Sequence, residues 1–362
     1  MNDSERDGFE RGHFEWRGFA RQGSDRAGGA PPSSAPSRSP GRRRLLGSLA
    51  AWPLLIQRGA QAQTFPSKPV RLVVPSPPGG GPDRVTRMVA ERLSRQWGTP
   101  VLVENKPGAT TRIGAEYVAR SPADGYTLLS TFTSHVQLPA LQKNLPFDTV
   151  RDFAPVSQMV RVETLFAVRA DAPWMTLRDF IAAARTAQPP LTYASFGQAS
   201  SFHIYGATLA HSAKIPLTHV PYKGEALQLN DLLGGQVMSS FNSLGTALPM
   251  IRAGRVRPLA LVAPARSKVL PDLPTFAEQG VGGLETVGWF GVLAPAQTPR
   301  EIVQRLSADI AAVIGDAEVT ATLRGQGLEP VGSSADQFTA TISADIAKWR
   351  SLVAGVGIEA SD

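Results

Sequence analysis

Short apolar runs, glycine-containing loops and amphipathic segments alternate along the chain from Val70 onward. Val70–Val74 is a β-branched run that Pro75 ends, as expected of a buried strand. The segment Pro82–Gln96 places apolar residues at helical spacing: Val85, Met88, Val89 and Leu93. Further apolar runs predict strands at Pro100–Glu104, Tyr126–Leu129, Leu165–Val168, Leu191–Ala194, Thr218–Val220, Val237–Phe241 and Pro258–Val262. This alternation predicts an α/β protein with mostly parallel sheets covered by helices on both faces.

Capping sequences predict the starts of three further helices. Thr176 precedes Asp179 by three residues, and Ser334 precedes Gln337 in the same way. Thr298-Pro299-Arg300-Glu301 combines a capping box with proline at the first helical position. We therefore expect helices to begin directly after Thr176, Thr298 and Ser334.

The first 62 residues differ in composition from the rest of the chain. Residues 1–40 are polar, are rich in Arg, Ser, Gly and Pro, and lack an apolar period, so we expect them to be unfolded. Three arginines then precede the apolar stretch Leu45–Ile56, and Ala60-Gln61-Ala62 fits a signal-peptidase site. These features predict an export signal over residues 1–62, cleavage near Ala62 and a mature periplasmic chain that starts at Gln63. The twin-arginine and Sec routes both remain open, as does a start codon further downstream.

Charge and cysteine content exclude several classes of partner and site. The net charge is +7, but residues 1–62 contain ten Arg and six acidic residues, whereas the other 300 contain 27 basic and 24 acidic residues. This larger part has no Lys/Arg block and no interleaved aromatic and basic residues, so we expect no nucleic-acid partner. The absence of cysteine excludes disulfides, thiolate nucleophiles and Cys-ligated metals.

The sequence also lacks the common motifs of catalysis and of nucleotide or metal binding. Ser195 does not lie in a Gly-x-Ser-x-Gly turn, and Gly79–Gly81 lacks the Lys-Ser/Thr of a phosphate-binding loop. His203, His211 and His219 are eight residues apart, not the four that place two ligands on one helix face. We predict no catalytic residues, no metal and no cofactor.

Two glycine-containing loops between a predicted strand and a helix are the candidate ligand sites. They are Pro75–Asp83 and Ser195–Ser201, and first-turn N–H groups of the helix after each loop favour an anion. Because the loops are more than 110 residues apart, they suggest two lobes that close on one acidic ligand. The candidate binding residues from these loops, the third loop at Thr133 and the following helices are Pro78, Gly79, Gly80, Gly81, Asp83, Thr133, Ser134, Ser195, Gly197, Ser200 and His203.

Several of these candidates also have a purely structural interpretation. Asp83 either orients the first loop or meets a ligand donor, or it only complements the helix dipole. Either Ser200 or Ser201 is expected to be an N-cap. Gly79–Gly81 either cradles an anion or only forms a tight turn, and His203 either donates to a ligand or packs.

Many short segments, in order, resemble one known family across nearly all of the mature chain. The sequence is similar to the Bug-type (TctC-like) extracytoplasmic solute receptors of the tripartite tricarboxylate transporter family. The matching segments are Phe65–Val70, Pro77–Asp83, Val103–Ala109, Asp124–Leu129, Leu145–Asp148, Asp152–Val156, Val220–Gly224, Asp231–Gln236 and Gly288–Gly291.

The resemblance implies a type II periplasmic-binding-protein-like α/β fold with two lobes, a hinge and an interlobe ligand cleft. Lobe 1 would comprise residues 63–164 and 288–362, lobe 2 residues 165–287, with crossings near Leu165–Arg169 and Val287–Leu293. The implied function is capture of a small organic acid for delivery to membrane permease subunits, by a chain that we expect to be a monomer. A periplasmic sensor that passes its bound form to a signalling partner is the alternative, followed by an enzyme on the same fold.

Three positions depart from the pattern of the family. Pro82 stands where Thr or Ser is usual, which removes a hydroxyl and an N–H donor, and Met238 and Asn242 stand where Asp is common. Asn242 is the last candidate ligand-binding residue. If the Asp of the family faces the cleft, an amide at this position alters the charge of the cleft. Amino-acid ligands that need an acidic partner are therefore disfavoured.

Overall fold

The computed structural model describes residues 65–358, which belong to one compact unit, residues 60–362. The predicted export signal at residues 1–62 lies outside the described residues. Within the described part of the chain, no helix combines the length and apolarity that a membrane span requires.

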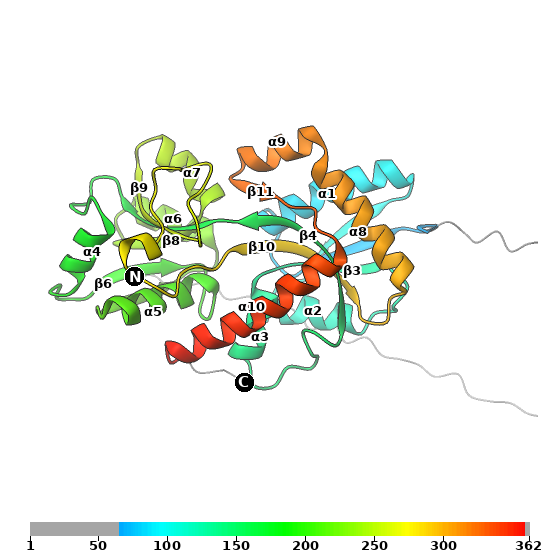
Figure 1. Ribbon diagram of the computed structural model, residues 1–362, viewed down its shortest axis with the longest axis horizontal. Helices are drawn as coiled ribbons and strands as arrows, with labels where there is room; N and C mark the ends of the chain where they lie inside the picture. The colour runs from blue at the N-terminus through cyan, green and yellow to red at the C-terminus, as the bar shows by residue number, and fades with distance from the viewer. Residues whose placement is uncertain (1–64, 359–362) are drawn as a thin grey trace, which may run out of the picture. The chain divides into compact units, whose positions relative to one another are not determined.

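A six-stranded sheet, called the first sheet below, has the strand order β11-β4-β10-β3-β1-β2. Its strands are β1 (Val70–Val74), β2 (Val101–Asn105), β3 (Thr127–Phe132), β4 (Phe153–Val162), β10 (Gly288–Pro295) and β11 (Leu328–Pro330). The helices between and after these strands are α1 (Gly81–Trp97), η1 (Ala109–Thr111), α2 (Arg112–Ala119), α3 (Ser134–Leu141), α8 (Arg300–Gly315), α9 (Ala317–Gly325) and α10 (Ala335–Gly355) (Figure 1).

A five-stranded sheet, called the second sheet, has the order β7-β6-β8-β5-β9. Its strands are β5 (Thr164–Arg169), β6 (Leu191–Ser195), β7 (Leu217–Pro221), β8 (Ser239–Ser243) and β9 (Val256–Val262). Its helices are α4 (Leu177–Ala184), α5 (Ser201–Ala213), α6 (Glu225–Leu233), α7 (Leu244–Arg252) and η2 (Ala277–Gln279).

Both sheets are mixed, so the prediction of mostly parallel sheets was wrong. β1 pairs in parallel with β2 and β3, and β6 pairs in parallel with β7 and β8. The other pairings, which involve β4, β5 and β10, are antiparallel. Only Glu163 separates β4 from β5. The chain therefore passes from one sheet into the other without the helical crossover that a parallel connection needs.

The predicted strands are present, with small shifts at their ends. β1 coincides with the predicted Val70–Val74, and α1 extends one residue beyond each end of the predicted helix. β8 lies two residues later than the predicted Val237–Phe241. The apolar pattern thus located each of these elements.

Two of the three predicted helix caps are confirmed. Thr176 and Ser334 each form a complete capping box with the residue three positions on. The box predicted at Thr298 is wrong, because Pro299 is in the extended N-cap position and α8 begins at Arg300. The Thr298 hydroxyl instead donates to the Pro295 carbonyl oxygen at 2.7 Å.

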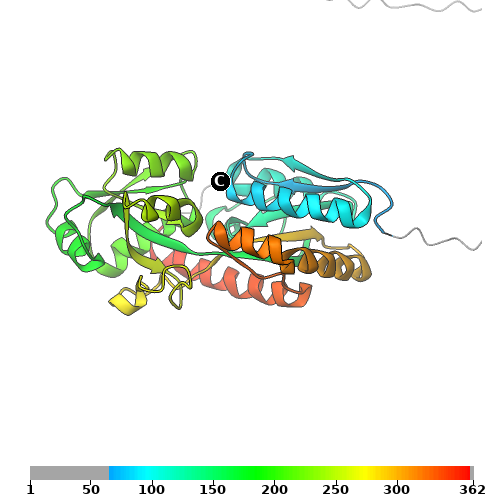
Figure 2. The same cartoon turned by 90° about the horizontal axis from the view of Figure 1, so that it is seen from above.

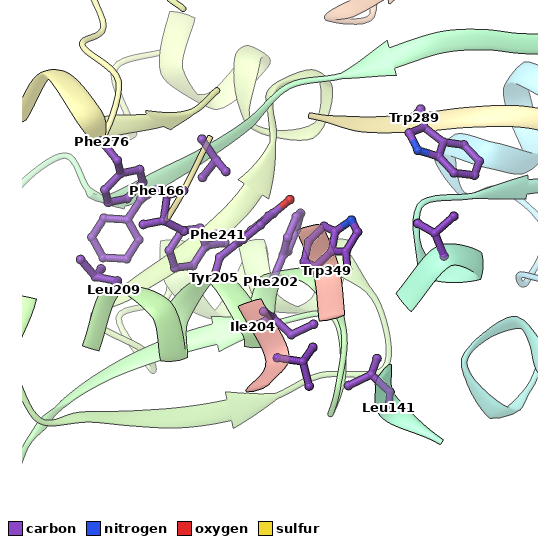
Figure 3. Packing of buried hydrophobic residues seen from close by; sticks show 14 of the residues in the cluster. Leu141, Phe166, Phe202, Ile204, Tyr205, Leu209, Phe241, Phe276, Trp289 and Trp349 are labelled. Carbon is purple, nitrogen blue, oxygen red and sulfur yellow. The ribbon is translucent and has the colours of Figure 1, made fainter. Parts of the chain in front are cut away.

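Large aromatic side chains connect α10 to helices and strands of both sheets (Figure 3). The ring centroids of Trp349 in α10 and Tyr205 in α5 are 5.5 Å apart. Trp289 in β10 belongs to the same buried cluster, and its indole N–H donates to Asp345 of α10 at 2.8 Å. In Figure 1, α10, in red, extends from the first sheet toward α5, and Figure 2 shows the same red helix turned by 90°. This helix therefore contributes to the packing of both sheets.

The tight packing of α5 on β6 gives a test of the fold. A Cβ atom at Gly206 would lie 1.9 Å from the Tyr193 ring, which is buried. We expect Gly206→Ala to lower the free energy of unfolding by about 2–3 kcal/mol, because the ring has no space into which to move. Gly315→Ala, whose Cβ would meet nothing within 4 Å, is the matched control. Urea unfolding measures both, and equal midpoints for the two variants would contradict the packing described.

Candidate functional site

Five helices of the described residues begin directly after parallel strands. α1 and α3 follow the parallel pair β1 and β3, whereas α5, α6 and α7 follow the parallel strands β6, β7 and β8. Parallel strands end at the same edge of a sheet, so the helix starts gather at one edge of each sheet.

Contacts between the helices join these two edges. Gln137 Nε2 in α3 donates to the Ser201 hydroxyl, the first residue of α5, at 2.7 Å. Glu225, the first residue of α6, accepts hydrogen bonds from the backbone N–H and the hydroxyl of Ser243, the N-cap of α7. Burial raises the pKa of Glu225 to about 7, and the hydrogen bonds from Ser243 and Thr246 and the charge of Arg84 in α1 oppose that rise. The five helix starts therefore lie at two sheet edges that the Gln137–Ser201 bond joins, and together we call them the helix-start site.

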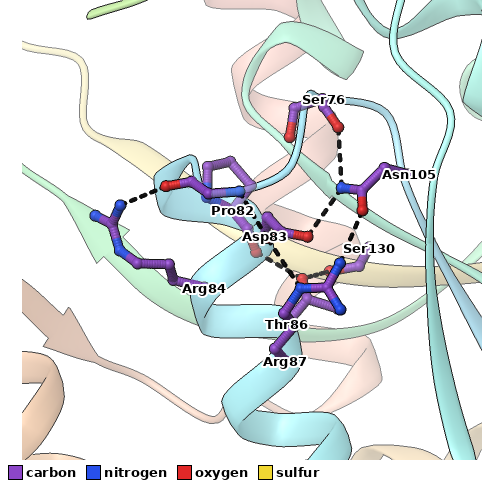
Figure 4. Close-up of polar contacts among 9 residues, drawn as sticks. Ser76, Pro82, Asp83, Arg84, Thr86, Arg87, Asn105 and Ser130 are labelled. Carbon is purple, nitrogen blue, oxygen red and sulfur yellow. Dashed lines mark hydrogen bonds and ion pairs between the residues drawn. The ribbon is translucent and has the colours of Figure 1, made fainter. Parts of the chain in front are cut away.

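A buried carboxylate holds the first loop in shape (Figure 4). Asp83 is 2% exposed, and its oxygens accept from Gly79 N–H at 2.8 Å, Arg87 Nε at 3.0 Å and Asn105 Nδ2 at 2.8 Å. Burial alone would raise the pKa of Asp83, but the hydrogen bonds from Arg87, Gly79 and Asn105 together hold it below its usual value. Asp83 therefore orients the first loop, which is one of the roles that the sequence suggested for it.

The first turn of α1 keeps free N–H donors beside this carboxylate. The N–H groups of Gly81 and Asp83 have no acceptor among residues 65–358, because a helix cannot satisfy its own first donors. Gly80 occupies the N-cap with ordinary extended dihedral angles, and Pro78 and Gly79 are exposed. Arg84 donates to the Gly79 carbonyl at 2.6 Å and adds a positive charge close to these donors. The arrangement is suited to an anion.

Side chains of the second loop bond mainly to backbone atoms of the loop and of the first turn of α5. The Ser195 hydroxyl lies 2.9 Å from the Gly197 carbonyl and 2.7 Å from His219 Nε2. Ser200 caps α5 through the N–H of His203, which confirms one of the two expected N-cap serines. His203 Nδ1 accepts from the Ala199 N–H at 3.1 Å. As in the first loop, the first-turn N–H groups of α5, on residues 201 and 202, have no acceptor within the described chain.

Two stacked histidines lie beneath the second loop. The rings of His203 and His219 are 3.9 Å apart and nearly parallel. Burial lowers the pKa of His203, and burial together with the neighbouring His203 lowers the pKa of His219 to about 4. Both imidazoles are therefore neutral near pH 7, so the positive charge at the site does not come from them.

The third candidate loop is also tied to the first sheet. Thr133 is buried, and its hydroxyl accepts from the backbone N–H of Trp289 at 2.8 Å. Ser134 is the first residue of α3 and is likewise buried. His135 follows it, and burial lowers the pKa of its imidazole to about 4.

Asn242 lies inside the second sheet. Three residues near the helix starts were not predicted from the sequence. Asn242 is fully buried, and its amide bonds to Gln228 and to Ser240. The missed residues are Gln137, Arg84 and Glu225. From the sequence alone, an acid in the first turn of a helix, such as Glu225, indicates only a favourable interaction with the helix dipole. Its contact with α7 could not be predicted, because that contact arises from the packing of two helices.

The chemistry of the helix-start site is that of hydrogen-bond donation rather than metal binding. Within residues 65–358 no group of three or more His, Asp or Glu residues is placed to hold a metal ion. Two cavities lie elsewhere, one of about 460 Å³ beside α4 and β9 and one of about 610 Å³ between α8 and α10. Neither is lined by the candidate residues, so the candidate site rests on the helix starts.

The buried Asp83 carboxylate makes part of the stability depend on pH. Its folded-state pKa is depressed, so its contribution is present above the ordinary Asp pKa near 3.9 and is lost as the pH falls through the folded value. We expect Asp83→Asn to lower the free energy of unfolding at pH 7 by about 2 kcal/mol. The deficit should shrink below about pH 4. Urea unfolding at both pH values measures it, with the exposed Asp336→Asn as control; a deficit independent of pH would contradict the assignment.

Comparisons with known proteins agree with the fold and with the sequence resemblance. The family model described as the tripartite tricarboxylate transporter family receptor matches residues 85–358. The UPF0065 protein in the tcbD-tcbE intergenic region of Pseudomonas sp. strain P51 is 34% identical over 315 residues, which cover 86% of this chain and 94% of that protein.

Three solved structures are similar over most of this chain. R. palustris Rpa4515 with adipate has 35% identity and a TM-score of 0.75, covering 82% of this chain and 100% of that one. The periplasmic binding protein BugD has 31% identity and a TM-score of 0.73, with the same coverage. MatC from Rhodopseudomonas palustris with bound malate has 28% identity and a TM-score of 0.71, covering 80% and 100%.

These matches confirm the resemblance and the expected fold class. The structural neighbours are periplasmic binding proteins with two lobes, and the two mixed α/β sheets found here have the same architecture. The chain belongs to the tripartite tricarboxylate transporter receptor family.

Proposed function

We propose that this chain captures a small carboxylate at the helix-start site and delivers it to the membrane permease of a tripartite tricarboxylate-type transporter. The observation that carries the proposal is the gathering of unpaired first-turn N–H groups from helices of both sheets. The relatives with bound adipate and malate support a carboxylate as the ligand class. Receptors of this family bind and pass on their ligand, so we propose no chemical conversion.

Two lobes that close on the ligand explain why donors from both sheets are needed. We propose that residues 63–164 with 288–362 form lobe 1 and residues 165–287 form lobe 2. The single residue between β4 and β5 is one of the connections about which the lobes would move. A ligand that contacts both lobes stabilises their closed arrangement, which a permease can distinguish from the open one.

The donors at the site are sufficient for useful affinity. A dissociation constant of 1 μM corresponds to about −8 kcal/mol. Each hydrogen bond to a charged group contributes roughly 1.5–3 kcal/mol. Four bonds from the first turns of α1 and α5 would contribute roughly 6–12 kcal/mol. With the charge of Arg84, this is enough to approach the required value after association costs of several kcal/mol.

Thermal unfolding against a panel of small acids and neutral amides tests the proposed function. A carboxylate present at 100 times its dissociation constant should add about 2.7 kcal/mol, seen as a rise of several degrees in Tm. Gly80→Leu should abolish the rise while leaving the ligand-free Tm nearly unchanged. The backbone at Gly80 suits any residue, and a Cβ there meets nothing closer than 3.8 Å, but a larger side chain would cover the donors of α1.

The same substitution at an exposed site is the control. Gly315→Leu, at the end of α8, should keep the full rise in Tm. A rise produced only by neutral amides, or a carboxylate response that survives Gly80→Leu, would contradict the proposed site.

A further inference from the structure

A carboxyl group of the protein itself occupies the start of α7. Glu225 Oε1 accepts from the backbone N–H of Ser243, and the Ser243 hydroxyl lies 2.8 and 3.0 Å from the two Glu225 oxygens. Ser243 makes no side-chain cap for α7, and the Thr246 hydroxyl also stabilises the Glu225 carboxylate. The two Ser243 donors at this helix start are therefore already bound by an acid from within the chain, and the Leu244 N–H donates to the Glu163 carbonyl.

The Glu225 carboxyl group lies at the edge of the second sheet from which α5 begins. α6 and α7 follow β7 and β8, these two strands flank β6, and α5 follows β6. Arg84 acts electrostatically on Glu225, and Arg84 itself donates to the Gly79 carbonyl. Figure 4 shows the Arg84 side chain extending away from the Asp83–Arg87 pair. A ligand that bridges the first turns of α1 and α5 would thus have its second end on the same sheet edge as Glu225.

One face of α6 presents hydrogen-bond acceptors. Gln228 lies three residues after Glu225, and residues at this spacing share a helix face. Gln228 is fully buried, and its Nε2 donates to the Phe241 carbonyl and to Asn242 Oδ1. Its Oε1 has no donor among the described residues. A ligand end that carries N–H donors matches this face, whereas a second carboxylate does not.

We propose that Glu225 selects a monocarboxylate whose other end is an amide or ammonium donor, and that it disfavours dicarboxylates. This inference rests on the proposed function. It differs from the sequence expectation that ligands needing an acidic partner are disfavoured, because here Glu225 supplies the acid and the buried Asn242 does not. A second ligand carboxylate would face the like charge of Glu225 and would find the donors of Ser243 already bound, whereas an amide or ammonium group would donate to the Glu225 oxygens. Glu225 thus acts through direct contact with the ligand, and Arg84 moderates its charge.

Matched pairs of ligands measure this selection directly. The probes are adipate and succinate, each beside its own monoamide, titrated into the full chain by calorimetry at pH 8. This pH lies above the pKa of the Glu225 carboxyl group, which burial raises to about 7. We expect each monoamide to bind roughly tenfold or more tightly than its diacid, since juxtaposed like charges cost several kcal/mol before screening.

Substitution of Glu225 should remove this preference. Glu225→Gln keeps the size of the side chain and an acceptor for Ser243 but removes the charge, so the preference should fall roughly tenfold or reverse. Glu225→Asp retains the charge and should retain the preference for the monoamide. Glu301→Gln, which removes an exposed acid from the first turn of α8, is the control and should bind as the wild type does.

The outcomes separate this inference from the proposed function. Equal preferences in the wild type and Glu225→Gln, or a wild type that prefers the diacids, would overturn the role of Glu225 while leaving a carboxylate receptor intact. If no acid binds the wild type at all, both proposals fail. Should Glu225→Gln not fold, Arg84→Gln decides instead. Loss of this cation should widen the preference for the monoamides, and an unchanged or narrower preference would overturn the inference.

Discussion

An α-helix cannot satisfy the N–H groups of its own first turn, and the candidate site depends on where this chain places five such turns. The parallel pairs within each sheet bring the starts of α1 and α3, and of α5, α6 and α7, to one edge each. The bond from Gln137 to Ser201 joins the two edges. An acidic ligand is the partner that such a concentration of donors favours, because the dipoles of the helices act on it together.

The polar side chains around these turns divide into two kinds. Asp83, Ser195 and Ser200 bond to backbone atoms of their own loops and fix the positions of the donors. Arg84 and Glu225 instead carry the charges, and the helices that bear them belong to different sheets. The first kind would make the site rigid before a ligand arrives, and the second would decide which ligand it accepts.

The connections between the sheets are where the proposed closure of the two lobes would take place. β4 continues into β5 through Glu163 alone. α10 contributes Trp349 to an aromatic cluster that also contains Tyr205 of α5 and Trp289 of β10. Packing of this kind has few alternative arrangements, so motion would be confined to the strand connections rather than spread through the interior.

Local patterns in the sequence predicted the local parts of the structure. The β-branched run at Val70–Val74, the helix after the glycines and the capping boxes at Thr176 and Ser334 depend on neighbouring residues alone. The antiparallel pairing was missed because pairing direction depends on how the chain passes between sheets. Glu225 was missed for a similar reason, since Ser243 lies 18 residues away and the contact requires α6 to pack against α7. The role of each candidate residue in ligand contact stays a prediction.

The central claim is that the ligand binds where the helices of the two sheets begin. Amide nitrogen and proton NMR shifts, recorded while the isotope-labelled protein is titrated with the tightest-binding carboxylate, test it most directly. The account predicts the largest shifts at the first turns of α1 and α5, with smaller ones at the starts of α6 and α7. Shifts confined to the cavity between α8 and α10, with none at the helix starts, would contradict it.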